Sequence, residues 1–214
     1  MVDEPTLLAP GRAGTHRFRE ARARSGVAAL VALGWGFAEA TFFFIVPDVW
    51  IGLLTLFGWR AGLRAVCSAV IGALIGGAVM YGVGAQLDRD RSARLLAAVP
   101  AISPAMVERV EEVMREHGPA SMMLGPVRGT PYKIYARTAG TQGQPLCAVL
   151  LWTIPARGTR FVLVAAVAGL YGWLVRRITR RMGWLLGPYF LVWAMFYARY
   201  FRAYGFWRSR GAAD

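Results

Sequence analysis

Cysteine, histidine and acidic residues are all scarce in this chain of 214 residues. Two cysteines are too few for a disulfide scaffold. The two histidines, His16 and His117, lie far apart in the sequence, so a histidine-rich metal centre is not expected. The 12 acidic residues are outnumbered by 25 lysines and arginines, which leaves a formal net charge of +13. A positive surplus of this size is typical of proteins that bind nucleic acid or an anionic membrane surface.

The hydrophobic content of the chain distinguishes between these two classes of partner. Hydrophobic residues make up 56% of the chain against 17% charged residues, whereas soluble domains have about 45–50% and about 25%. Four hydrophobic tracts stand out, at 27–57, 61–87, 146–175 and 184–198, and a membrane-spanning helix needs about 20 apolar residues. We therefore expect an integral membrane protein without a nucleic-acid partner. The alternative is the buried helical core of a soluble protein.

The first tract has an unsuitable length and a break near its centre. A straight helix over 27–57 would be about 46 Å long, which exceeds a hydrocarbon core of about 30 Å, yet the tract is too short for two spans. Pro47 removes a backbone donor and disrupts a helix, and Asp48 adds a charge beside it. These features predict a re-entrant hairpin at about 34–57, which carries Glu39 and Asp48 at membrane depth.

The connector between the second and third tracts is predicted to contain an amphipathic helix. Residues 104–117 alternate apolar and charged side chains at helical spacing. Ser103 is suited to the N-cap, Pro104 to the first turn, and Gly118-Pro119 to the end of the helix. We expect this helix to lie along the membrane interface. A soluble cap helix is the alternative.

A second interrupted segment, at about 119–145, follows this helix. Glycines and prolines prevent one long helix, and the segment carries Arg128, Lys133 and Arg137. Its charges are thus opposite to those of the first break. Two broken apolar segments in corresponding positions are typical of pseudo-symmetric transporters with a site near the bilayer midplane.

Charged side chains at membrane depth usually face a cavity and pair with one another. Arg128 and Arg160 are the expected counter-ions of Glu39 and Asp48, because arginine stays charged and binds carboxylate or phosphate as a fork. In this interpretation the charges serve transport or lipid handling. The alternative is that they are fixed salt bridges that hold two hairpins together.

The two ends of the chain are basic. Residues 1–26 form a predicted N-terminal arm and residues 201–214 a C-terminal tail, on either side of a single membrane domain at 27–200. The arm is not a cleavable signal peptide, because the tract that follows is too long. The positive-inside rule places both ends in the cytoplasm. An arginine cluster at 176–181 also favours the cytoplasm. This cluster and the C-terminal tail lie on either side of the last hydrophobic tract, so the orientation of the cluster stays open.

Several motifs together resemble the DedA family, also called SNARE-associated or VTT-domain proteins, in its short YqaA-like branch. They run in order through residues 34–175: Glu39, Pro47-Asp48 with Val-Trp-Ile-Gly-Leu-Leu, Gly72-xxx-Gly76, Tyr81-x-Val-Gly84, Arg128-x-x-Pro131, Ala139-Gly140 and Gly158. The resemblance implies two facing re-entrant loops that bring two acids and two cations near the midplane. Glu39 and Asp48 would be the acids and Arg128 the first cation, while the second cation is Lys133 or Arg137.

The resemblance also implies a function in lipid transport: movement of polyprenyl phosphate or phospholipid across the bilayer, in some members coupled to protons.

Taken together, the sequence predicts an all-α integral membrane protein of the cell membrane, with two re-entrant helical hairpins, about three transmembrane helices and an interfacial helix. Its site residues would be Glu39, Asp48, Arg128, Lys133, Arg137 and Arg160. Membrane lipids are the expected partners, a homo-oligomer is left open, and no cofactor or metal is expected. A membrane scaffold is the alternative. An enzyme is not expected, because no nucleophile–base pair or set of metal ligands is visible.

Overall fold

The described part of the chain contains helices and their connections, and no strands. The computed structural model describes residues 12–100, 102–179 and 181–203, so most of the predicted C-terminal tail and the first residues of the N-terminal arm lie outside it. The helices are α1 (Arg12–Thr41), α2 (Asp48–Phe57), α3 (Trp59–Gln86), α4 (Arg89–Ala97), α5 (Pro104–His117), the 3-10 helix η1 (Gly118–Leu124), α6 (Gly125–Arg128), α7 (Tyr132–Thr141), α8 (Leu146–Ile178) and α9 (Met182–Ala203).

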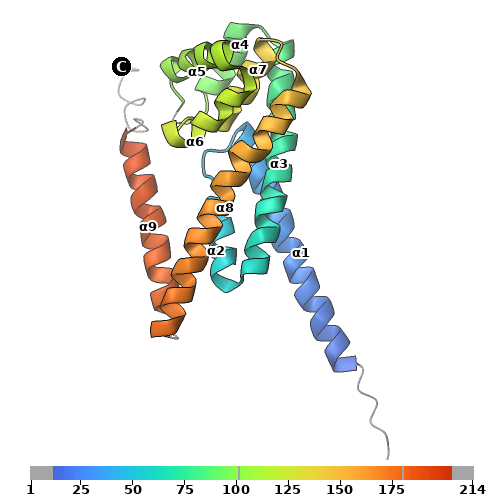
Figure 1. Cartoon of the computed structure of the whole chain (residues 1–214), viewed down its shortest axis with the longest axis vertical. Coiled ribbons are helices and arrows are strands. Elements are labelled where there is room, and N and C mark those ends of the chain that lie inside the picture. Colours follow the sequence, from blue (N-terminus) through green and yellow to red (C-terminus); the bar gives the residue numbers. More distant parts are fainter. Residues whose placement is uncertain (1–11, 101, 180, 204–214) are drawn as a thin grey trace, which may run out of the picture.

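Two long helices, α3 and α8, form the centre of the molecule (Figure 1). Helix α1 packs along α3, and the short α2 packs against both α3 and α8. The short helices α4 to α7 gather at one end, where α7 also packs on α3. Helix α9 stands at the side of α8 (Figure 1). The described region is thus a helical bundle with a cap of short helices at one end.

The break predicted in the first hydrophobic tract is present. Helix α1 ends at Thr41, residues 42–47 are not helical, and α2 begins at Asp48 directly after Pro47. Figure 1 shows that α2 then runs back toward the end of the molecule from which α1 came. At the other side of the tract, α1 starts at Arg12, so no helix boundary falls at residue 26.

The predicted amphipathic helix is confirmed at its expected bounds. It is α5, Pro104–His117, and the Ser103 hydroxyl caps it by accepting a hydrogen bond from the Met106 N–H at 3.3 Å. Its apolar stripe, which includes Val107, Val110 and Met114, is buried against the other short helices of the cap. The interruption predicted after it is also present, because η1, α6 and α7 replace one long helix. Gly129 ends α6 with a φ of 66°, a conformation that favours glycine.

Close backbone contact joins α1 to α3. A Cβ atom on Gly72 would lie 2.0 Å from the Leu33 carbonyl oxygen, and one on Gly76 would lie 2.7 Å from the Ala40 Cβ. Only glycine lets the two backbones approach so closely. The Gly72-xxx-Gly76 pair therefore acts as the contact surface between the two helices.

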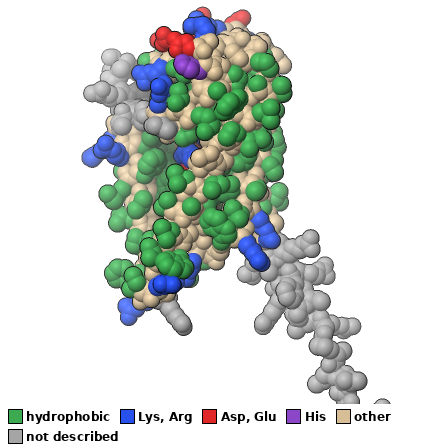
Figure 2. Space-filling model, viewed as in Figure 1, with side chains coloured by type: hydrophobic (Ala, Val, Ile, Leu, Met, Phe, Trp, Pro, Cys, Tyr) green, Lys and Arg blue, Asp and Glu red, His purple; other side chains and the backbone are tan. Residues whose placement is uncertain are grey.

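Among the described helices, α3 and α8 are long and apolar enough to cross a membrane, against about three expected from the sequence. Only 33% of the apolar window of α3 and 22% of that of α8 is buried inside the protein, whereas the core helix of a soluble protein is mostly buried. Figure 2 shows hydrophobic side chains over the middle of the visible face and acidic ones at one end. Apolar surface of this extent is unusual on soluble monomers.

The tight packing at Gly72 gives a first prediction. Gly72→Val places a branched side chain against the α1 backbone, so we expect it to lower stability by about 1–3 kcal/mol, the usual cost of overpacking. Thermal unfolding in detergent measures this. Gly82→Val on the same helix is the matched control, because a Cβ there meets no atom within 4 Å. Equal melting temperatures for the two variants would contradict the close contact.

Candidate functional site

Two buried carboxylates flank the break between α1 and α2. Glu39 lies in the last turn of α1 with 4% of its surface exposed, and Asp48 is the first residue of α2 and is fully buried. The helix N-terminus favours a negative charge at Asp48. Buried carboxylates at a helix break require positive partners, since an isolated buried charge is very costly.

Two arginines of α8 supply those partners. Arg157 donates from Nη2 to Glu39 Oε2, and Arg160 donates from Nη2 to Asp48 Oδ2 at 2.5 Å. The two arginines are three residues apart and therefore lie on one face of α8. Arg157 also lies over the rings of Tyr132 and Phe161, at 5.4 and 4.9 Å from their centroids. The ion pairs fasten the break to α8.

The predicted counter-ion Arg160 is thus confirmed, whereas Arg128 is not. Arg128 ends α6 at the surface, where it is exposed, and it forms no ion pair with Glu39 or Asp48 in the described structure. The sequence analysis missed Arg157 as a site residue. The available signal was the pair of arginines at helical spacing inside an otherwise apolar tract.

Lys133 connects the second interrupted segment to the first. It lies in the first turn of α7, is buried, and donates from Nζ to the Phe43 carbonyl oxygen at 2.6 Å. Phe43 belongs to the non-helical residues between α1 and α2. Among the described residues Lys133 has no carboxylate within ion-pair distance, so it is a cation held by a backbone carbonyl alone.

A cavity of about 680 Å³ lies where these elements meet. Its charged walls are Glu39, Lys133, Arg157 and Arg160. Aromatic side chains of the break and of α9 also line it, as do residues 99–102 and residues of the second interrupted segment. We call this cavity the chamber. Its volume is within the range of ligand sites, about 300–1,000 Å³.

The charges around the chamber do not balance. Among the described residues, three cations, Lys133, Arg157 and Arg160, lie near two acids, Glu39 and Asp48, so one formal positive charge is left. In the same part of the chain, the buried donor Arg157 Nε and the buried acceptor Asp48 Oδ1 have no hydrogen-bond partner. Native structures contain few such atoms, and each calls for an explanation. The surplus positive charge and the unused Arg157 donor are suited to a further anion with hydrogen-bonding oxygens, whereas Asp48 Oδ1 requires a donor.

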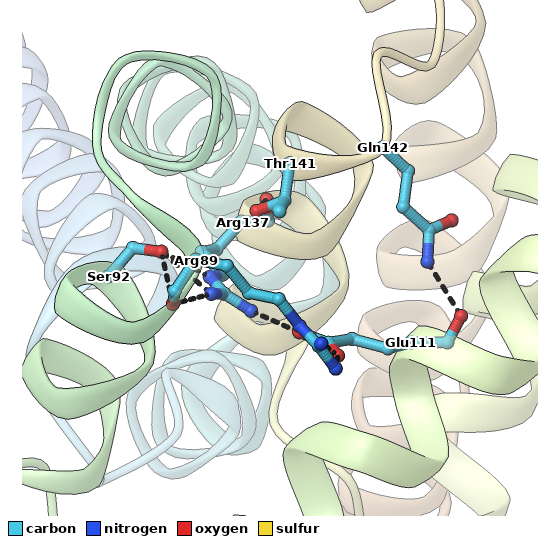
Figure 3. A network of polar contacts seen from close by, with 6 residues as sticks. All are labelled: Arg89, Ser92, Glu111, Arg137, Thr141 and Gln142. Atoms are coloured by element: carbon cyan, nitrogen blue, oxygen red, sulfur yellow. Dashed lines mark hydrogen bonds and ion pairs between the residues drawn. The ribbon is translucent and has the colours of Figure 1, made fainter.

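Arg137, expected at the same site, lies in a different cluster. It is fully buried in the cap, where Nη1 donates to Glu111 Oε1 at 2.7 Å and Nε to Ser92 Oγ at 2.9 Å. It also donates to the Arg89 carbonyl oxygen, and Arg89 itself pairs with Glu111 (Figure 3). These contacts join α4, α5 and α7. Arg137 is occupied by them and does not line the chamber.

Glu111 is the hub of this cap cluster. Burial would raise the pKa of its carboxyl, but hydrogen bonds from Arg89 and Arg137 and their positive charges outweigh burial and lower the pKa. The Gln142 side chain also donates to the Glu111 carbonyl oxygen at 2.6 Å. The cluster thus stabilises the cap through an ionised Glu111.

Among the described residues, no three His, Cys, Asp or Glu side chains lie close enough together to hold a metal ion. No protein-family model matches the chain, and neither a curated protein nor a solved structure shows significant similarity to it.

The pair of Glu39 and Arg157 gives a second prediction. Glu39→Gln leaves Arg157 as an uncompensated buried charge, and we expect a cost of about 3–5 kcal/mol. The double variant Glu39→Gln with Arg157→Met removes both charges and should recover part of this loss. Unfolding in detergent measures both variants. A double variant less stable than the single one by the full cost of a second deletion would contradict direct pairing.

The lowered pKa of Glu111 gives a third prediction. Its contribution to stability is complete above the ordinary carboxyl pKa and is lost as the pH falls through the lowered pKa of the folded state. The wild type should therefore lose more stability between about pH 5 and pH 3 than Glu111→Gln does. Glu108→Gln, at an exposed position on the same helix, is the control and should behave as the wild type. Parallel pH curves for all three proteins would contradict the prediction.

Proposed function

We propose that the chain is a multi-pass protein of the cell membrane. Helices α3 and α8 span the bilayer, α5 lies along its interface, and the segments 34–57 and 119–145 enter it as re-entrant elements. The apolar exposed surface of α3 and α8 supports this placement. Because basic residues favour the cytoplasmic side, the N-terminal end of α1 lies in the cytoplasm. Helix α9 ends at the opposite end of the molecule from the start of α1 (Figure 1), so the expectation that both ends lie in the cytoplasm does not fit spanning α3 and α8 helices.

The proposed activity is the movement of a phosphate-bearing lipid across the bilayer, by a transporter or scramblase of the DedA type. One observation carries this proposal: the chamber holds a buried lysine that no carboxylate of the described residues pairs with, beside two arginines, with aromatic and aliphatic walls around them. A phosphate group satisfies such donors, and the apolar walls suit the lipid body. Glu39, Asp48 and Lys133 are among the positions that the resemblance to DedA implies.

In this proposal, protons act on the carboxylates of the two ion pairs. Protonation of Glu39 or Asp48 would weaken its ion pair and release an arginine toward the chamber. An anionic headgroup would then compete with the carboxylate for the same guanidinium. Binding of the lipid and of the proton would thereby favour one opening of the chamber over another.

A second candidate function is a membrane scaffold with purely structural charges. The observation in its favour is that Glu39 and Asp48 are each already paired with an arginine. Lys133 separates the two candidates, because no carboxylate pairs with it in the described part of the chain. As a scaffold residue it serves only to donate to the Phe43 carbonyl, whereas in a lipid transporter its charge also binds the headgroup.

The fourth prediction follows from this difference. In vesicles that contain headgroup-labelled phosphatidylglycerol or polyprenyl phosphate, the wild type should expose the label at the outer leaflet much faster than protein-free vesicles. Lys133→Met should reduce this rate at least about tenfold, a loss of ~1.4 kcal/mol, while the protein stays folded. The rate is followed at several pH values and with an imposed proton gradient.

Arg128→Met is the matched control, since it removes an exposed cation that lies close in the sequence to residues of the chamber wall. It should retain most of the wild-type rate. Movement equal to that of empty vesicles under all conditions would contradict the lipid transporter. An active Lys133→Met protein would contradict the role of the chamber and favour the scaffold.

A further inference from the structure

Helix α9 approaches the chamber by a stripe of three aromatic residues. Tyr189, Trp193 and Tyr197 recur every fourth residue and so lie on one face of the helix. Both tyrosines bond to the backbone at the break between α1 and α2: the Tyr189 hydroxyl donates to the Val49 carbonyl at 2.5 Å, and the Tyr197 hydroxyl accepts from the Val46 N–H at 2.9 Å. This aromatic stripe is the line along which α9 is attached.

An apolar slot lies on each side of the aromatic stripe. The first, of about 590 Å³, separates α9 from the break and the start of α2, with Trp35, Ile45 and Phe190 in its walls. The second, of about 450 Å³, separates α9 from α8, with Val164, Val167 and Val192 in its walls. Neither slot has a charged residue in its walls.

Both slots adjoin the chamber. Phe43 and Tyr197 line the chamber and the first slot, and Leu163 lines the chamber and the second slot. Trp193 lies between the slots and lines both. A positively charged chamber thus lies next to two apolar slots that the aromatic stripe keeps apart.

We propose that the slots are subsites for the two hydrocarbon chains of an anionic lipid that straddles α9, with its headgroup in the chamber. This inference rests on the proposed function and deepens it. The charge of the chamber requires an anionic head, and the uncharged slots require hydrocarbon. Because the aromatic stripe divides the slots, a lipid with one chain fills one of them and leaves the other without a ligand, whereas a two-chain lipid fills both.

The experiment measures binding to the full-length protein in detergent. The probe is a fluorescent phosphatidylglycerol, displaced either by unlabelled phosphatidylglycerol or by its lyso form, which has the same headgroup and one chain. We expect the two-chain competitor to bind at least about tenfold more tightly, a difference of ~1.4 kcal/mol.

Two variants fill one slot each with a bulky ring. Ala194→Trp acts on the first slot and Val192→Trp on the second, and each should bring the affinity for the two-chain lipid close to that for the lyso form. Met195→Trp is the control, because Met195 is exposed on α9 and lines neither slot. Its affinities should equal those of the wild type.

Equal affinities for both competitors, or slot variants that bind as the wild type does, would overturn the two-chain subsites. The failure of the proposed function is distinguishable, since it would leave a normal two-chain preference without any transbilayer movement in vesicles. Conversely, transbilayer movement without a preference for two chains would overturn only this inference.

Discussion

The architecture depends on two ion pairs that bind a broken helix to an intact one. Glu39 and Asp48 lie on the two sides of a gap in the α1–α2 segment, and Arg157 and Arg160 reach both from a single face of α8. Without them, two carboxylates would be buried without positive partners, which is very costly. The pairs also fix the geometry of the chamber, because they define which face of α8 its wall presents.

Local features of this structure could be predicted from the sequence, since they depend on neighbours in the chain. Ser103, Pro104 and Gly118 mark the bounds of α5, and Pro47 marks the start of α2. The Gly72-xxx-Gly76 spacing is typical of close helix packing, and the two glycines lie at the close contact between α1 and α3. The pair of Arg160 and Asp48 joins residues 112 apart, and it could be expected only because charges in apolar tracts usually pair with one another.

Long-range pairing could not be predicted in the same way. Glu39 and Arg157 are separated by 118 residues, and their contact depends on how far α8 rotates about its own axis. The apolar residues of α8 are distributed around its whole circumference, so its sequence has no apolar stripe from which the rotation of the helix could be inferred. Arg137 was assigned to the site because of its position near Lys133, but Glu111 and Ser92 hold it in the cap. Arg128 was expected both as a counter-ion of the acids and from the resemblance, but it lies exposed at the end of α6.

The chain offers an unusually direct test, because Lys133 is its only lysine. Labelling with nitrogen-15 lysine therefore produces one side-chain amine signal, and solid-state NMR of the protein in phosphatidylglycerol vesicles can report whether phosphorus lies close to it. If the chamber holds a lipid headgroup, the Lys133 Nζ signal should be strongly dephased by phosphorus-31, as expected for direct contact. A signal that phosphorus leaves unchanged would contradict the central claim that the buried cation at the helix break binds lipid phosphate.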